Sequence, residues 1–165
     1  MKRIILSLVL VQLLILSIPA QTVSDGVKTA FLDFQNINMD PALDYLGGII
    51  KGLLLYDLSQ NEYIQLVNRS ELENVMEEQN LRLSGLSEDS ENAIKVGRIL
   101  GADWLIKGEY IYLGKDVLMT ISVIDVETAR VFAFSERGSS ENTIHSLAEK
   151  IVMKLTGMEV TLQNE

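Results

Sequence analysis

The pattern of hydrophobic and polar positions is clearest between Val96 and Phe134. A helical segment ends at Gly101, and apolar and polar side chains then alternate over residues 103–112 and again over 117–125. A repeat of two residues is typical of strands, and the short turns after each segment favour an antiparallel meander of three strands. Residues 117–125 are apolar or small at nearly every position. We therefore expect this strand to be central and covered at least partly on both faces.

Strands and helices alternate in the rest of the chain. Short alternating segments predict strands at Val27–Phe34 and Tyr63–Val67. Helices are expected to begin at Asp40-Pro41, at Ser70, at Ser87 and at Ser139 or Ser140, where a side-chain oxygen can accept from first-turn amides. The resulting order, β-α-β-α-α-β-β-β-α, predicts an α/β (α+β) fold in which helices pack on a mixed five-stranded sheet.

Two of these helices have a clear one-sided pattern. In the last helix the apolar residues recur at spacings of three and four, at Ile144, Leu147, Ala148, Ile151, Val152 and Leu155. Such a stripe predicts one buried face, and Gly157 is expected to end this helix. The helix before the meander is expected to bury Ala93, Val96, Ile99 and Leu100.

The helix that begins at Asp40 combines a wide apolar stripe with three glycines. The stripe comprises Ala42, Leu43, Leu46, Ile49, Ile50, Leu53 and Leu54. Gly47, Gly48 and Gly52 each cost a helix about 1 kcal/mol relative to alanine. One interpretation is close packing of the helix on the sheet, which we favour because no phosphate-binding pattern accompanies the glycines. The alternative is that they shape a groove that faces a ligand.

The segment after the second strand predicts a helix followed by a leucine-rich loop. Ser70 and Glu73 have the spacing of a capping box, and the helix is expected to end near Asn80. Its buried residues are expected to be Leu72, Val75 and Met76. The loop then carries Leu81, Leu83 and Leu86. These leucines either tuck under neighbouring elements or form an exposed contact patch for a partner.

The first twenty residues have the composition of a secretory signal peptide. Two basic residues precede an apolar run, Ile4–Ile18, which a proline and an alanine follow. The run is shorter than the roughly 20 apolar residues that a spanning helix needs, which disfavours an uncleaved membrane anchor. We therefore expect residues 1–20 to be removed, residues 21–157 to form one domain and residues 158–165 to form a polar tail.

Composition excludes several classes of partner. The chain has 14 Lys and Arg against 23 Asp and Glu, a net charge of −9, which becomes −11 without the two basic residues of the leader. Because the basic residues are scattered singly, we expect neither a nucleic-acid partner nor docking on anionic lipid. The chain has no cysteine. It can therefore form no disulfide, thiolate metal site or cysteine nucleophile, and it offers no cysteine for lipid attachment.

No pattern typical of catalysis stands out. The glycine motifs that bind phosphates or dinucleotides are absent. The only histidine, His145, is expected to be solvated on the polar side of the last helix, between Glu141 and Glu149. Asp125 and Glu127 have the spacing of turn residues. We predict no catalytic residue, cofactor or dedicated metal site, and weak calcium binding between surface carboxylates is left as an alternative.

Four segments of the chain, in this order, resemble a known family. They are AFLDFQNINMDPALDYLGGIIKGLL (30–54), VNRSELENVMEEQNLRLSGL (67–86), VGRILGADWLIKGEY (96–110) and VLMTISVIDVETARVFAFSERG (117–138). Together they resemble the CsgG-type family of curli-production assembly and transport proteins and related bacterial envelope proteins. The resemblance implies a periplasmic α/β domain that acts through protein contacts, often in rings, and it brings no catalytic residues.

The resemblance and the empty search for chemistry predict a non-enzymatic periplasmic module. We expect an assembly or accessory subunit of a cell-envelope or outer-membrane secretion-type complex, with envelope proteins or copies of itself as partners and no membrane span after signal cleavage. Two departures from the channel-forming relatives argue against a pore: no cysteine for a lipid anchor and no extra segments for membrane hairpins. The alternative is a periplasmic domain that binds a small molecule or glycan through the glycine-rich helix and residues 36–40.

Overall fold

The computed structural model describes residues 26–79 and 90–157. Its strands are β1 (Val27–Asn36), β2 (Ile64–Leu66), β3 (Trp104–Tyr112), β4 (Val117–Asp125) and β5 (Val131–Gly138). Its helices are a 3-10 turn, η1 (Pro41–Leu43), then α2 (Tyr45–Ser59), α3 (Arg69–Glu78), α5 (Ser90–Leu100) and α6 (Glu141–Thr156). The order of elements confirms the predicted α+β fold.

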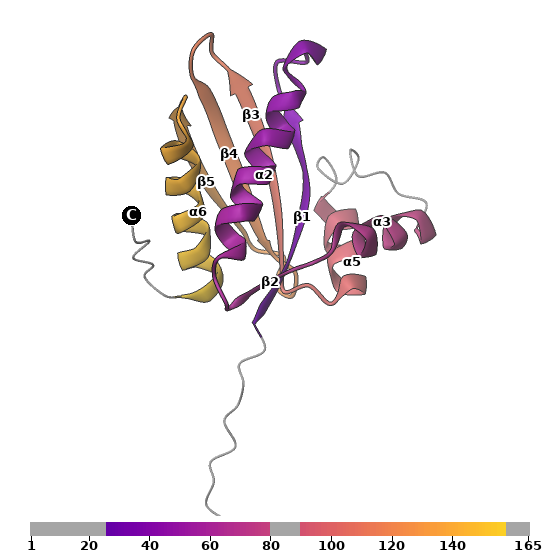
Figure 1. Ribbon diagram of the computed structural model, residues 1–165. Coiled ribbons are helices and arrows are strands. Elements are labelled where there is room, and N and C mark those ends of the chain that lie inside the picture. Colours follow the sequence, from indigo (N-terminus) through magenta and orange to yellow (C-terminus); the bar gives the residue numbers. More distant parts are fainter. Residues whose placement is uncertain (1–25, 80–89, 158–165) are drawn as a thin grey trace, which may run out of the picture.

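The five strands form one mixed sheet in the order β2-β1-β3-β4-β5 (Figure 1). β1 lies parallel to both β2 and β3, while β3, β4 and β5 form the predicted antiparallel meander. The parallel pairing places Thr29 of β1 opposite Trp104 of β3. The residues just before these two, Lys28 and Asp103, are 75 positions apart in the sequence. They are joined directly, because the Lys28 amide donates to Asp103 Oδ2 at 2.8 Å.

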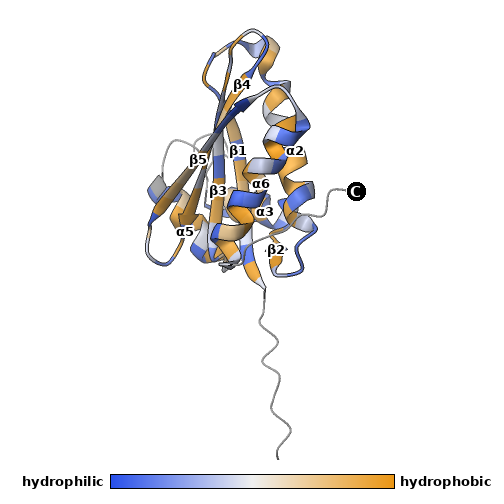
Figure 2. Ribbon diagram, turned by 90° about the vertical axis from the view of Figure 1, so that its left-hand side faces the viewer, coloured by the Kyte–Doolittle hydropathy of each residue, from blue (hydrophilic) through white to orange (hydrophobic). Residues whose placement is uncertain are grey.

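Helices cover both faces of the sheet, and each face has its own core. Figure 2 shows α2 and α6 on one side of the strands and α5 on the other, with hydrophobic residues (orange) facing the sheet. On β4, Ile121 belongs to the core under α2 and α6, whereas Ile124 belongs to the core under α3 and α5. The expectation of a central strand covered on both faces is therefore confirmed.

The predicted apolar stripe of α6 is confirmed, and Ser140 is the N-cap residue, although its side chain makes no capping hydrogen bond. All six residues of its stripe are buried: Ile144, Leu147, Ala148, Ile151, Val152 and Leu155. The helix ends at Gly157, which has a φ of +70° and whose amide donates to the Met153 carbonyl oxygen at 2.9 Å. A positive φ costs glycine nothing, so this residue is well suited to close the helix.

The cap of α3 was predicted at the wrong residue. Asn68 caps the helix, because its Oδ1 accepts from the Ser70 amide at 2.9 Å. Glu73, the expected second member of a capping box, instead accepts from Arg69 Nε at 2.7 Å. Asparagine and serine are both good N-caps, and the sequence offers both within three positions, so propensity alone could not decide. The predicted cap at Ser87 lies outside the described residues.

Three residues predicted to be buried are exposed. Ile49 exposes 51% and Ile99 exposes 46% of its surface, and Ala42 lies in the exposed η1 turn. In α5 the buried position belongs to Gly97, where a Cβ would approach Val126 Cγ2 to 3.0 Å. Gly47 and Gly97 thus face the sheet, whereas Ile49 and Ile99 do not.

Asp125 holds the turn between β4 and β5, as its spacing from Glu127 predicted. Its Oδ1 accepts from the Thr128 amide at 2.9 Å and from the Glu127 amide at 3.0 Å. The hydrogen bond from the Thr128 amide is the main cause that lowers the pKa of Asp125 below its ordinary value. The charged form is therefore favoured in the folded protein.

Replacing Asp125 by alanine is expected to lower the free energy of unfolding by about 1 kcal/mol, because two turn amides lose their acceptor. A lowered folded pKa stabilises the protein above the ordinary carboxyl pKa, and this stabilisation is lost as the pH falls through the folded value. Urea unfolding across acidic pH measures both effects. Asp125→Asn keeps an acceptor and should lose mainly the pH dependence, whereas equal losses in both variants would contradict this account.

Candidate functional site

One face of α2 is both apolar and exposed. Between Tyr45 and Tyr56 the helix carries a single charged residue, Lys51. Tyr45, Ile49 and Tyr56 expose 62%, 51% and 64% of their surface, and the exposed Gly52 lies in the same row. We call Tyr45, Ile49, Gly52 and Tyr56 the α2 surface. A helix that is apolar on all sides is normally buried, and an exposed apolar row of this kind is typical of contact faces.

The opposite side of α2 holds the helix tightly on the sheet. Its buried residues include Ile50, Leu54 and Leu58. A Cβ at Gly47 would lie 3.0 Å from Tyr110 Cε1 and 3.2 Å from the carbonyl oxygen of Phe34. The Tyr110 hydroxyl donates to the Leu43 carbonyl oxygen at 3.0 Å, and burial raises the pKa of Tyr110. Because of this close fit, α2 cannot rotate to bury its exposed face.

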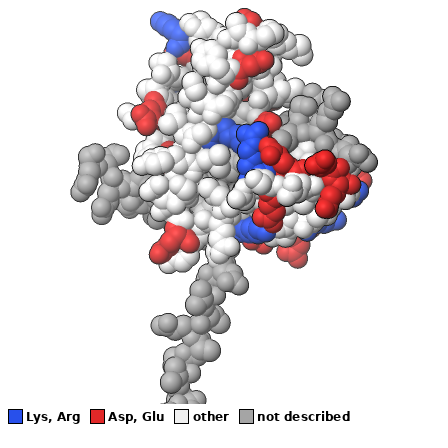
Figure 3. Space-filling model, turned by 45° about the vertical axis from the view of Figure 1, so that its right-hand side comes forward, with Lys and Arg blue, Asp and Glu red and all other residues white. Residues whose placement is uncertain are grey.

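Charge is unevenly distributed around α2. Figure 3 shows a cluster of basic side chains near the middle of one face and acidic side chains gathered to its right. The area to its left, on the side of α2 and α6 (Figure 1), is largely uncharged, with a few acidic side chains at its margins. In a chain with a net charge of −9, an uncharged area avoids repulsion between like charges. The largely uncharged area is therefore compatible with a protein contact on this side of the molecule.

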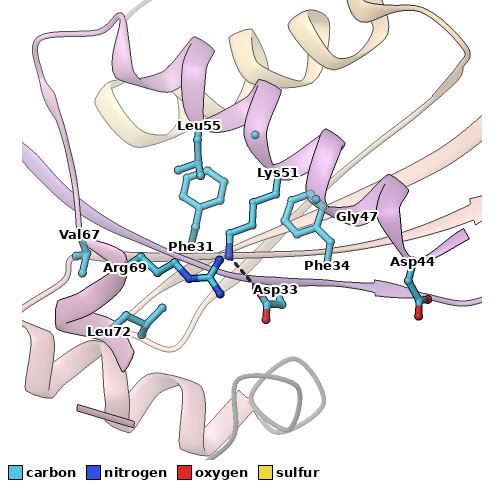
Figure 4. A pocket seen from close by; sticks show the side chains of 12 residues that line it. Phe31, Asp33, Phe34, Asp44, Gly47, Lys51, Leu55, Val67, Arg69 and Leu72 are labelled. Atoms are coloured by element: carbon cyan, nitrogen blue, oxygen red, sulfur yellow. Dashed lines mark hydrogen bonds and ion pairs between the residues drawn. The ribbon is translucent and has the colours of Figure 1, made fainter. Parts of the chain in front are cut away.

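A groove of about 430 Å³ lies between α2 and α3, above β1 (Figure 4). We call it the β1 groove. It is lined by Phe31, Asp33, Phe34, Asp44, Gly47, Gly48, Lys51, Gly52, Leu55, Val67, Arg69 and Leu72. The pairing of β1 with β3 shifts register between Phe31 and Phe34, and both rings pack on the α2 side of the sheet. The irregular strand thus supplies two aromatic walls.

Charges of both signs meet in the β1 groove. Lys51 Nζ lies 2.8 Å from Asp33 Oδ1. The Arg69 side chain points into the groove toward Asp33 in Figure 4, and its hydrogen bond to Glu73 raises the pKa of Arg69. Aromatic walls combined with a few charged groups are common in sites for small polar molecules.

The two interpretations of the three glycines each apply to part of the set. Gly47 packs closely on the sheet, which confirms the favoured interpretation at this position. A Cβ at Gly48 or Gly52 would meet nothing within 4 Å, and both residues line the β1 groove. Close packing was therefore the wrong explanation for Gly48 and Gly52, which instead leave space above the sheet.

Other residues singled out in the sequence lie elsewhere. The predicted partner contact of Leu81, Leu83 and Leu86 lies outside the described residues. His145 is not simply solvated in an acidic row, because its Nδ1 lies 3.1 Å from Asp57 Oδ2 of α2. The pair joins α6 to α2 through half-buried side chains. No local sequence signal connects two residues 88 positions apart, so this contact could not be predicted.

Metal-binding clusters and membrane-spanning helices are both absent from residues 26–79 and 90–157. Within these ranges no group of three or more His, Asp or Glu residues could hold a metal ion. None of the helices in the same ranges is long and apolar enough to cross a membrane. The described surface does combine an exposed apolar helix face with a neighbouring groove.

The structure defines an α+β domain with an exposed apolar helix face, and comparison with protein families gives its family. The family model described as "Curli production assembly/transport component CsgG" matches residues 28–118. This range exceeds half of the 165 residues, so the chain belongs to the CsgG family, as the sequence resemblance predicted. No curated protein matches the chain.

Solved structures share the fold at low sequence identity. The LpoB C-terminal domain from Salmonella enterica is 14% identical, with a TM-score of 0.58, over 73% of this chain and 88% of that one. The LpoB C-terminal domain from Escherichia coli is 16% identical, with a TM-score of 0.57, over 77% and 91%. TolB from Acinetobacter baumannii is 13% identical, with a TM-score of 0.53, over 82% and 29%. These similarities establish the fold alone.

Proposed function

We propose that this protein is a non-enzymatic accessory or assembly subunit of a bacterial cell-envelope complex and that it binds its partner through the α2 surface. The observation that carries the proposal is the exposed apolar row on α2, held outward by the close fit of Gly47 against Tyr110. Membership of a family described by assembly and transport supports the same role. Leu81, Leu83 and Leu86 are a second proposed contact with the partner.

The proposal includes the location of the protein. Residues 1–20 act as a signal peptide, residues 21–157 form the domain and residues 158–165 form a tail. The mature domain then works in the periplasm, peripheral to the outer membrane, where partner proteins of the envelope are available. The charged, apolar and small-residue order of the leader supports export.

Replacing Ile49 by glutamate is expected to lower recovery of the partner at least tenfold. A charge at the centre of an apolar contact loses the burial of the isoleucine and buries an unpaired carboxylate, which costs more than about 1.4 kcal/mol. The measurement is a quantitative pull-down from envelope extract, with the tagged chain expressed from its full sequence. Ile99→Glu is the matched control, since Ile99 is an equally exposed isoleucine on α5. Equal recoveries with both variants would contradict the α2 surface as the contact.

A second candidate function is the binding of a small polar molecule or glycan in the β1 groove. The volume of about 430 Å³ and the pairing of aromatic walls with Lys51 and Arg69 support it. A ligand found by thermal shift should lose its effect in Gly48→Leu, because the leucine fills open space in the groove. A ligand-induced shift that persists in this variant would place the ligand elsewhere. Ile49→Glu should leave the shift unchanged.

A further inference from the structure

The β1 groove carries charges of opposite sign at its two ends. In Figure 4, Asp44 lies at one end of the groove and Arg69 at the other, with Lys51 between them. Asp44 directly precedes α2, and Lys51 follows on the same helix. The two positions are about two helical turns apart, which corresponds to about 10 Å along the groove.

The Asp44 end of the groove is negative. Asn36 Nδ2 donates to Asp44 Oδ1 at 2.8 Å, and a neutral amide does not compensate the charge of a carboxylate. In the described part of the chain, none of the ion pairs includes Asp44. Its side chain also makes no capping hydrogen bond with α2. The Asp44 carboxylate can therefore bind a positively charged group of a ligand.

The Arg69 end of the groove is positive. Lys51 Nζ lies 2.8 Å from Asp33 Oδ1, and Arg69 points toward the same carboxylate in Figure 4. At this end two cations of the groove lining thus share one carboxylate. Arg69 Nε donates to Glu73 at 2.7 Å, which leaves the donors on the two terminal nitrogens of the guanidinium. Because these donors can bind a carboxylate through two parallel hydrogen bonds, this end suits the negative group of a ligand.

Between its charged ends the groove is apolar and open. Phe31, Phe34 and Leu55 line this part. A Cβ at Gly48 or Gly52 would meet nothing within 4 Å, so space remains along α2. The side chains of a ligand can occupy this space while its charged groups reach both ends of the groove.

The signs and the spacing of these charges fit a short peptide. A peptide with free ends carries an ammonium group at one end and a carboxylate at the other. An extended chain advances about 3.3 Å per residue, so about three residues span the distance between the two ends of the groove. A neutral glycan matches neither charge. The charges therefore distinguish between the classes of ligand that the groove could hold.

We propose that the β1 groove binds a short peptide of about three residues, with its ammonium group at Asp44 and its carboxylate at Arg69 and Lys51. This inference rests on the second candidate function, because it uses the same groove, and it names the class of ligand. It does not depend on the α2 surface.

Isothermal titration of the full chain with trialanine and with Ala-Phe-Ala tests the proposal. At least one of these tripeptides should bind. Acetylation of its amino end and amidation of its carboxyl end should each weaken binding at least tenfold, because each removes one charge. Gly48→Leu should abolish binding, since the leucine fills the open space in the groove. Binding of neither tripeptide, or equal affinities for the free and capped forms, overturns the proposal.

Two variants assign the ends of the peptide. Asp44→Asn keeps an acceptor for Asn36 and should weaken binding of the free tripeptide at least tenfold, without further weakening that of the acetylated one. Arg69→Gln should act in the same way on the free and the amidated tripeptide. Arg98→Gln is the matched control, because Arg98 is an exposed arginine on α5. Equal losses for the free and capped forms in both variants would overturn the assigned ends.

Failure of this inference can be told apart from failure of the proposed functions. A neutral sugar whose thermal shift is lost in Gly48→Leu, together with no binding of either tripeptide, would overturn the peptide as ligand and support the groove as a site. Ile49→Glu should leave tripeptide binding unchanged, so loss of the envelope partner is a separate result.

Discussion

Replacing Leu147 by alanine is expected to lower the free energy of unfolding by about 2 to 5 kcal/mol. Leu147 has no exposed surface and belongs to the core between α6, α2 and the sheet. The change loses the burial of three carbon atoms and leaves a cavity that a sheet between two helix layers can only partly close. Since a domain is typically stable by about 5 to 15 kcal/mol, this single change would remove a large share.

Urea unfolding followed by the fluorescence of Trp104, the only tryptophan, measures this loss. Met153→Ala on the same helix is the control, because Met153 exposes 42% of its surface. The control should change stability by about 0.5 kcal/mol or less. If the two variants lost equal stability, the face of α6 that meets the sheet would be wrongly assigned.

Gly47→Leu and Gly48→Leu are expected to have opposite effects on stability. Both replace glycine by leucine in α2, which alone favours the helix by about 1 kcal/mol. At Gly47 the new side chain would collide with Tyr110 and with the Phe34 backbone, and such overpacking typically costs about 1 to 3 kcal/mol. At Gly48 a Cβ meets nothing within 4 Å, so the gain in helix propensity remains.

Thermal unfolding of the two variants beside the wild type provides the measurement. Gly47→Leu should unfold at a lower temperature and Gly48→Leu at the same or a higher one. Two variants that both lose stability would mean that α2 also packs closely around Gly48. If both variants gained stability, Gly47 would have more room than the positions of Tyr110 and Phe34 indicate.

Patterns that repeat over many residues made the fold predictable. The stripe of α6 spans more than three turns, and the alternation of the meander covers two strands in full. Tertiary contacts therefore did not change the type of these elements. Each residue of such a pattern supports the others, which is why the order of elements and the mixed sheet followed from the sequence.

Local choices between similar residues were harder to predict. Asn68 and Ser70 are both good caps, and only the path of the chain from β2 into α3 selects Asn68. The positions of Ile49 and Ile99 fit the helical spacing of apolar residues as well as the positions of their buried neighbours do. Which face a helix buries depends on the surface it meets, and at Gly97 that surface leaves no room for a side chain.

The candidate site depends on contacts between distant segments. The β1 groove joins β1, α2 and the start of α3, and its aromatic walls arise from a register shift that no propensity predicts. The sequence did indicate the glycines of α2 as a feature with two explanations. It could not show that Gly47 faces inward while Gly48 and Gly52 face outward, because the rotation of α2 is set by its fit on the sheet.

Site-specific photo-crosslinking in cells tests most directly whether the α2 surface binds a partner. A photoreactive residue at Tyr56 should give a discrete crosslinked product with a protein other than this chain, and Ile49→Glu in the same chain should abolish it. A photoreactive residue at Ile99, on the opposite face of the sheet, should not give that product. The same product from both positions, or none from Tyr56, would contradict the central claim.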